Sequence, residues 1–210
     1  MQDPELQNAT ASEPLSLNEE YDMQRSWRTD HDKLTFIVNL PLLEHDQVDG
    51  SKAIDQGEFD SDERMIGDIN LFLSANTDGH TESPTREAST RLVGEIELMI
   101  ARKDLQRHGY GRAALMTFMH YIISHWTSIS NEYALRLKEP LGPDLAYLRV
   151  RINESNHRSI RLFESVGFEQ LPGGANYFGE VELRWTKSIG DLEGLKWFER
   201  PRIGRYCIHE

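Results

Sequence analysis

The sequence predicts an α/β (α+β) domain in which a mixed, mostly antiparallel sheet is flanked by helices. Three apolar runs follow one another in the first half of the chain, separated by polar segments, as in an antiparallel meander. A glycine-containing stretch then leads from the third run into a long segment with helical periodicity. A further alternating run, a short amphipathic segment and a final pair of strands follow. The length of 210 residues suits one such domain with a tail.

The first half begins with a helix over about residues 17–28, because Ser16 and Glu19 form a capping box ahead of it. We expect its contacts to come from Tyr21, Met23, Gln24 and Trp27. Alternation and β-branched residues predict strands at 34–40, 65–73 and 93–101. The acidic and turn-rich segments 41–63 and 74–90 are expected to be loops.

The second half is predicted to start with a helix at 110–125. Residues 127–144 are ambiguous, although NEYALRLK could form a helical turn. A strand is expected at 146–152, then a short helix with Ile160, Phe163 and Val166 on its apolar side and Gly167 as its C-cap. FEQL and YFGEVELRW form two more strands paired through PGGAN. We assign residues 1–186 to the domain and 187–210 to a tail docked by Trp197 and Phe198.

Composition excludes several classes of function. The net charge is −12, so general nucleic-acid binding is not expected. No apolar run approaches the roughly 20 residues that span a bilayer, and the N-terminus does not resemble a secretory signal. The single cysteine, Cys207, fits a reducing compartment, and we expect a cytoplasmic protein. Residues 1–92 carry 20 Asp and Glu against 7 Lys and Arg, which could attract a basic substrate or serve solubility alone.

The stretch QRHGYG at 106–111 stands where a strand ends and a helix begins. Free backbone N–H groups at a helix N-terminus, together with the helix dipole, bind phosphate oxygens. Glycine allows a left-handed backbone and a close ligand approach, and Arg107 and Arg112 add positive charge. The spacing matches neither a P-loop nor a dinucleotide fingerprint, so an ordinary turn is the alternative to a phosphate site.

Two motifs resemble a known family. Gln106-x-x-Gly109-x-Gly111 resembles the pyrophosphate loop of the GCN5-related N-acetyltransferase (GNAT) superfamily, and N-x-x-S-I-x-L-F-x-x-x-G-F at 156–168 resembles its second cofactor segment. TASEPLSLNEEYDMQRSW, GDINLFL, GEIELMIA and SIRLF are similar to the N-acetyltransferase 9-like branch. The resemblance implies a GNAT fold, with the sheet splayed between two central strands. It also implies that the first edge strand is missing, which would expose the strand at 34–40.

The resemblance implies acetyl-CoA as the co-substrate. Its pyrophosphate would lie on the loop formed by Gln106, Arg107, His108, Gly109, Tyr110, Gly111 and Arg112. Its pantetheine arm would enter the gap between the splayed strands and pair with backbone amides near Leu98, Met99 and Ile100. Asn156 and Ser159 would contact the arm, although capping the following helix is their alternative role. Phe163 occupies the position of the family's proton-donating tyrosine and cannot donate.

Acetyl transfer to an amine requires a proton acceptor. Glu95 and Glu97 share one face of the predicted strand. By its spacing from Gly109 the resemblance assigns the general base to Glu95, acting through water, with Glu97 as the substitute; the alternative is that they are solvated or bind the positive charge of the substrate. Tyr177 is an alternative proton donor to the leaving thiolate, against a role as an ordinary strand aromatic. His120 and His125 do not share a face, and we expect no metal site.

The sequence therefore predicts an acetyl-CoA-dependent N-acetyltransferase that acts on a protein or peptide amine by direct attack in a ternary complex. The resembled branch implies tubulin as a candidate partner. A small amine is an alternative acceptor. A non-catalytic module that binds acetyl-CoA, a microtubule or another protein is the alternative from a different class. The sequence does not specify the oligomeric state or whether the acceptor is an α-amine or a lysine.

Overall fold

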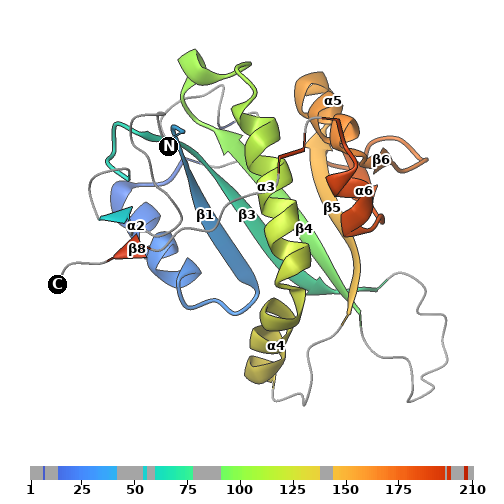
Figure 1. The fold of residues 1–210 in the computed structure, drawn as a ribbon, viewed down its shortest axis with the longest axis horizontal. Coiled ribbons are helices and arrows are strands. Elements are labelled where there is room, and N and C mark those ends of the chain that lie inside the picture. The colour runs from blue at the N-terminus through green and yellow to red at the C-terminus, as the bar shows by residue number, and fades with distance from the viewer. Residues whose placement is uncertain are drawn as a thin grey trace.

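The computed structural model describes Gln7 and residues 14–41, 54–55, 60–77, 91–137, 144–196, 198–199 and 206–207. Within these residues, six strands form one sheet in the order β1-β3-β4-β5-β7-β6 (Figure 1). The strands are β1 (Lys33–Asn39), β3 (Met65–Ala75), β4 (Leu92–Ile100), β5 (Leu145–Asn153), β6 (Glu169–Gln170) and β7 (Glu180–Trp185). The helices are α2 (Leu17–Trp27), η2 (Lys103–Leu105), α3 (Tyr110–Ser124), α4 (Trp126–Leu137), α5 (His157–Val166) and α6 (Ile189–Glu193). The predicted α/β fold class is confirmed.

The sheet consists of two antiparallel halves joined by one parallel pair. β1, β3 and β4 form the predicted meander, and β5, β7 and β6 form the second half. The central strands β4 and β5 pair only from Leu92 to Glu95 on β4, whereas β4 stays paired with β3 as far as Ile100. β4 and β5 therefore diverge beyond Glu95, and the sheet is splayed there as predicted. We call this gap the fork.

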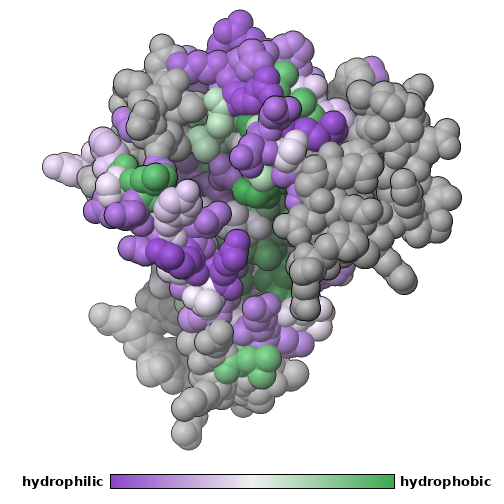
Figure 2. Space-filling model, turned by 90° about the vertical axis from the view of Figure 1, so that its left-hand side faces the viewer, coloured by the Kyte–Doolittle hydropathy of each residue, from purple (hydrophilic) through white to green (hydrophobic). Residues whose placement is uncertain are grey.

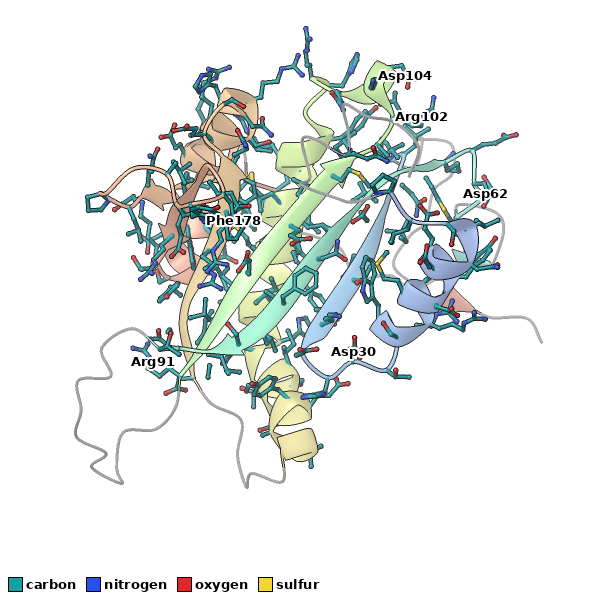
Figure 3. The ribbon with its side chains drawn as sticks, turned by 180° about the vertical axis from the view of Figure 1, so that it is seen from behind. Asp30, Asp62, Arg91, Arg102, Asp104 and Phe178 are labelled. Carbon is teal, nitrogen blue, oxygen red and sulfur yellow. The ribbon has the colours of Figure 1, made fainter. Side chains whose placement is uncertain are left out.

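Strand alternation gives the sheet one apolar face and one polar face. The apolar face carries Ile69 and Leu71 of β3, Ile96 of β4 and Leu148 of β5, all buried. It packs against α3, whose Leu115, Met119 and Ile122 are buried at the spacing of a single helix face. The opposite face, which we call the polar face, carries Lys33, Thr35, Asp68, Asn70, Phe72, Glu95, Glu97, Arg149, Arg151, Glu182 and Arg184. Figure 3 views the sheet from this side, with α3 behind the strands.

Helix α2 confirms one prediction and corrects another. Ser16 and Glu19 form the capping box, and α2 ends at Trp27 with Arg28 as its C-cap. However, α2 has no buried residue, and Tyr21, Met23 and Gln24 are exposed, so these three do not anchor it. Figure 2 views the molecule from the side on which α2 lies in Figure 1, and apolar residues are scattered there among hydrophilic ones. Within the described sheet β1 is an edge strand, and its Ile37 is 51% exposed.

Two further elements differ from expectation. The ambiguous segment after His125 is the helix α4, longer than the single turn suggested by its sequence. Segment 41–63 was predicted as a loop, but Ile54–Asp55 forms the short strand β2, which pairs in parallel with β8 (Tyr206–Cys207). In the tail, the Phe198 ring lies 5.6 Å from that of His120. Trp197 and most of the predicted loops lie outside the described residues.

Candidate active site

The glycine-containing loop joins β4 to α3 through two residues with left-handed backbone. Arg107 has φ 68° and Gly109, the N-cap of α3, has φ 90°. Left-handed conformation is costly for a residue with a Cβ, which explains glycine at 109. A Cβ added there would meet no heavy atom of the described residues within 4 Å, so the surroundings of Gly109 are open in this part of the structure. The backbone conformation therefore requires this glycine. The open space beside it leaves room for a ligand to approach the backbone.

Two hydrogen bonds inside the loop fix its shape. The Gln106 side-chain Nε2 donates to the carbonyl oxygen of Ile100 at 2.9 Å. The Nδ1 of His108 lies 2.9 Å from the carbonyl oxygen of Gln106. Gln106, the first residue of the motif, thus ties the loop to the last residue of β4. This bond gives the glutamine a structural reason of its own, independent of any ligand.

The N-terminus of α3 presents backbone donors at this loop. The first main-chain bond of the helix runs from the Ala113 N–H to the Gly109 carbonyl, and within the described residues no side chain caps Gly109. The N–H groups of Tyr110, Gly111 and Arg112 precede that bond and have no acceptor in the helix. Arg112 adds a guanidinium whose buried Nε finds no hydrogen-bond partner among the described residues. Helix dipole and charge together favour an anion here.

The two sequence motifs, more than 40 residues apart, meet in the fold. The position of a Cβ on Gly111 lies 3.5 Å from Leu162 of α5 and 3.8 Å from Leu98 and Ile100 of β4. The Arg112 Nη2 donates to the Ser165 hydroxyl of α5 at 3.2 Å. The loop, the start of α3, the end of β4 and α5 therefore surround one region at the mouth of the fork.

The fork exposes the edge of β4. The Leu92 N–H donates toward β5, to Asp144, and the Ala101 N–H donates toward β3, to Ile66. Because backbone groups alternate along a strand, those of Ile96, Leu98 and Ile100 face β5, where β4 has no paired residue beyond Glu95. The Ile100 carbonyl is taken by Gln106. Of the predicted set, Leu98 and Ile100 thus face the fork, whereas the backbone groups of Met99 face β3.

The second motif has a clear structural role. Asn156 is the N-cap of α5, and its Oδ1 accepts from the Ser159 N–H at 3.2 Å. The capping alternative is therefore realised for this pair. Gly167 is the C-cap with φ 103°, as predicted. Phe163 is buried and lies edge-on to Phe168 with ring centroids 5.0 Å apart, so it is a core residue.

Glu95 is engaged by arginines on β5. Its Oε2 accepts from both Nε and Nη2 of Arg149 at 2.7 Å, and Arg151 lies 3.7 Å away. Arg151 and Arg184 also pair with Glu182 of β7, at 3.5 and 2.6 Å. To accept a proton from a substrate, Glu95 would have to give up part of this network.

Glu97 stands in a different environment. Its side chain reaches solvent, yet the surrounding protein removes part of the hydration of the carboxylate and raises its pKa. The negative charges of Glu95, Asp68 and Glu180 raise this pKa further, and Lys33 lowers it. A carboxylate that holds its proton more tightly than usual, beside the fork, is suited to proton transfer.

Tyr177 is not a strand residue in the structure. It falls in the turn before β7, is 96% exposed, and packs edge-on against Phe178 with ring centroids 5.4 Å apart. Figure 3 labels Phe178, which marks this loop. The strand position expected for Tyr177 is therefore wrong, and its assignment as a proton donor stays a prediction without a supporting contact.

Sequence reasoning missed three polar-face residues: Arg149, Asp68 and Asn70. Alternation within each strand could have placed them on the same face as Glu95 and Glu97. The pairing of Arg149 with Glu95 depends on the register between β4 and β5, which has no local signal. Among the described residues, no three His, Cys, Asp or Glu side chains gather as a metal site. No described helix combines the length and the apolar character needed to cross a membrane.

Comparisons with known proteins show the family of this chain. Residues 1–169 match the family described as acetyltransferase (GNAT) domain. An N-acetyltransferase 9-like protein of Schizosaccharomyces pombe is 40% identical over 200 residues, covering 90% of this chain and 86% of that protein. The alpha/beta-tubulin-N-acetyltransferase 9 of Homo sapiens is 35% identical over 195 residues, covering 93% of this chain and 75% of that protein.

Two solved structures share the fold. A domain from Methanocaldococcus jannaschii superposes with a TM-score of 0.51 at 18% identity, covering 88% of this chain and 86% of that one. A spermidine N-acetyltransferase chimera from Vibrio cholerae gives a TM-score of 0.51 at 15% identity, covering 90% of each chain. At these identities the likeness concerns the fold alone.

Proposed function

This chain belongs to the GNAT family of acetyltransferases, and we propose that it transfers the acetyl group of acetyl-CoA to an amine of a protein. The observation that carries the proposal is the meeting of the 106–111 loop, the start of α3 and the open edge of β4 at one mouth of the sheet. Each of these features offers backbone or side-chain donors, which supports the binding of an extended phosphate-containing thioester across them.

Three observations support a fit to acetyl-CoA. The surroundings of Gly109 are open, which suits a diphosphate laid against the backbone of the loop. The buried Arg112 Nε has no partner among the described residues, and an anion would complete it. The backbone groups of Leu98 face an unpaired edge, which could bond to the amides of a pantetheine arm.

The chemistry assigns tasks to this chain's own groups. Bound acetyl-CoA supplies the thioester, whose acyl carbon forms a bond to the amine nitrogen as its bond to sulfur breaks. An N–H of the β4 edge would donate to the carbonyl oxygen, which gains negative charge during the attack. Of the two protons that the ammonium loses, one goes to a β4 carboxylate and then to solvent, and the other ends on the thiol. Because Phe163 carries no acidic proton, we propose that solvent delivers the proton that the leaving thiolate sulfur receives.

Glu97 is our first choice for that carboxylate. Its raised pKa and exposed side chain support this role, whereas the Oε2 of Glu95 already accepts from two donors of Arg149. The prediction that Glu95 is the base is kept as the alternative. In that case Arg149 would have to move away during the reaction.

Tubulin is the acceptor that we propose, because the human relative is named as an alpha/beta-tubulin N-acetyltransferase and 93% of this chain aligns with it. A cytoplasmic location is part of the same proposal and would fit the single cysteine. The excess of acidic residues over residues 1–92 would favour a positively charged acceptor segment.

A coenzyme A release assay tests the proposal. Tubulin dimers, peptides with a free α-amine, peptides with a single lysine amine, and spermidine would be offered to the wild type, Glu95→Gln and Glu97→Gln. We expect turnover with a protein or peptide amine and a loss of 10²-fold or more in kcat for Glu97→Gln. A larger loss for Glu95→Gln would reassign the base. Binding of acetyl-CoA without turnover of any acceptor would replace the enzyme by a binding module.

A further inference from the structure

We propose that the acceptor amine is held, as its ammonium, on the polar face of the sheet between Asp68, Asn70 and Glu97. The inference rests on the proposed transferase function and specifies where its second substrate binds. It concerns a face of the sheet that is separate from the loop and from the first turn of α3.

The three side chains are brought together by the register of β3 and β4. Asn70 follows Asp68 by two residues on β3 and is the cross-strand partner of Glu97 on β4. All three therefore project from the same face, and Asn70 stands between the two carboxylates. The Asn70 Nδ2 donates to the Asp68 Oδ2 at 2.7 Å, which fixes the orientation of the amide.

The side-chain amide of Asn70 has a hydrogen-bond partner on its nitrogen but none on its oxygen among the described residues. The residue is only 4% exposed, and its buried Oδ1 has no hydrogen-bond donor among the described residues. Buried polar atoms in proteins almost always have a partner, so an exception calls for an explanation. Because the Asn70 Nδ2 donates to Asp68, the Asn70 Oδ1 is the atom that remains to accept a hydrogen bond from a ligand. A ligand that supplies an N–H donor would complete it.

The charges around this oxygen favour a cation. Glu97 is faced by Glu95 on its own strand, by Asp68 on β3, by Glu180 of β7 and by Lys33 of β1. Lys33 is already paired with Asp30 at 2.8 Å, and Arg149 and Arg151 are paired with Glu95 and Glu182. The described cations that face this group are thus already engaged. Burial raises the pKa of Asp68 as well as that of Glu97, as expected for carboxylates that lack a full positive partner.

A primary ammonium matches this set in number and charge. It has three N–H donors, and the site offers one neutral amide oxygen and two carboxylates. The Glu97 side chain is exposed, so a ligand can reach this set of groups from solvent on the side of Glu97. Glu97 lies between Ile96 and Leu98, whose backbone groups face the fork, so the nitrogen would be held next to the thioester site. Asp68 would position Asn70, Asn70 would bind the ammonium, and Glu97 would take its proton.

The experiment uses three peptides of one sequence that contains a single lysine. The first has a free α-amine and an acetylated lysine, the second has an acetylated N-terminus and a free lysine, and the third is blocked at both amines. The enzymes are the wild type, Asn70→Leu and Asp68→Asn. Asn39→Leu is the matched control, because the buried side-chain Oδ1 of Asn39 on β1 also has no hydrogen-bond partner among the described residues but lies at the bulge near the end of β1. Thermal unfolding establishes that each variant is folded.

We expect Asn70→Leu to raise the KM for the preferred amine peptide about tenfold or more, since a hydrogen bond to a charged group is lost. The KM for acetyl-CoA should not change, and Asn39→Leu should behave as the wild type. Asp68→Asn keeps the bond to Asn70 but removes a charge. It should therefore raise the peptide KM and weaken its increase at low pH, where the wild-type carboxylates become protonated. If Asn70→Leu does not fold, Asp68→Asn decides.

Unchanged peptide KM values in folded Asn70→Leu and Asp68→Asn would overturn the site while leaving the transferase function in place. If the wild type acetylates none of the peptides, the proposed function fails, and calorimetry in the presence of coenzyme A tests the site directly. A wild type that binds the free-amine peptide at least tenfold more tightly than the blocked one, a preference absent in Asn70→Leu, would support the site. Equal binding of the free and blocked peptides would overturn it.

Discussion

Glu95 and Arg149 form an ion pair across the only parallel contact in the described sheet. They are 54 residues apart in sequence, and both Nε and Nη2 of Arg149 lie 2.7 Å from the Oε2 of Glu95. The side chain of Arg149 is 17% exposed and that of Glu95 is 20% exposed, so solvent screens the pair only in part. The pair lies at the last paired residue of β4, where the fork begins. It therefore joins the two halves of the sheet at the point where they separate.

The first prediction concerns the stability of that joint. A double-mutant cycle with Glu95→Gln and Arg149→Met should give a coupling free energy of about 1–2 kcal/mol in urea unfolding. The matched control is the pair Lys187–Glu169, at 3.2 Å but 39% and 77% exposed, whose coupling should stay below about 0.5 kcal/mol. Equal couplings for the two pairs would mean that Arg149 does not hold the halves together.

The second prediction links the raised pKa of Glu97 to stability. A raised pKa in the folded state means that the folded protein binds the proton more tightly than the unfolded chain does. The contribution of Glu97 to stability is therefore lost as the pH rises above its ordinary value of 4.5. Glu97→Gln should have a higher Tm than the wild type at pH 7, with the difference vanishing near pH 4.

The measurement is thermal unfolding at the two pH values, together with the coenzyme A release assay. Glu132→Gln removes the same charge from an exposed position on α4 and should change the Tm little at either pH. A Glu97→Gln variant that is more stable yet less active would mark Glu97 as a residue kept for function. A lower Tm at pH 7 would show instead that the carboxylate has a stabilising partner.

The third prediction separates backbone strain from ligand binding in the loop. Gly109→Ala should cost about 1–2 kcal/mol of stability, because φ is 90° there, and should also weaken acetyl-CoA binding at least tenfold. Gly174→Ala is the control, since Gly174 has φ 77° and equally open surroundings in the turn between β6 and β7. It should lose similar stability with unchanged acetyl-CoA affinity by calorimetry. Equal affinities for the two variants would argue against the loop as the diphosphate site.

The fourth prediction resolves the two roles of Asn156. Asn156→Ala removes the N-cap of α5 and should lower stability by about 1 kcal/mol. Asn156→Asp keeps a capping oxygen and should retain stability, but it loses the amide donor and adds a negative charge. If Asn156 also contacts the cofactor arm, the aspartate variant will bind acetyl-CoA several-fold more weakly than the wild type. An unchanged dissociation constant in a stable Asn156→Asp would leave capping as its role.

Local rules account for much of the fold that the sequence predicted. The capping box at Ser16 and Glu19, the C-cap at Gly167 and the core positions Leu115, Met119 and Ile122 depend on neighbours within a few residues. Strand alternation likewise determined that Glu95 and Glu97 share a face. Local rules failed for α4, where the sequence has no decisive periodic signal, and for β2, which needs a strand 152 residues away to pair with.

The tertiary structure decided what those glutamates can do. The pairing of β4 with β5 shifts by one residue between Leu92 and Val93, so that Glu95 lies opposite Arg149 rather than Leu148. A one-residue shift changes which face a partner side chain occupies, and no short-range pattern encodes it. The sequence by itself determined that acidic side chains line one face of a strand ahead of a phosphate-binding loop. Only the register between distant strands determined that Glu95 pairs with an arginine and that Glu97 lies beside Asn70. The physical reason is that ion pairs and burial depend on neighbours that only the fold brings together.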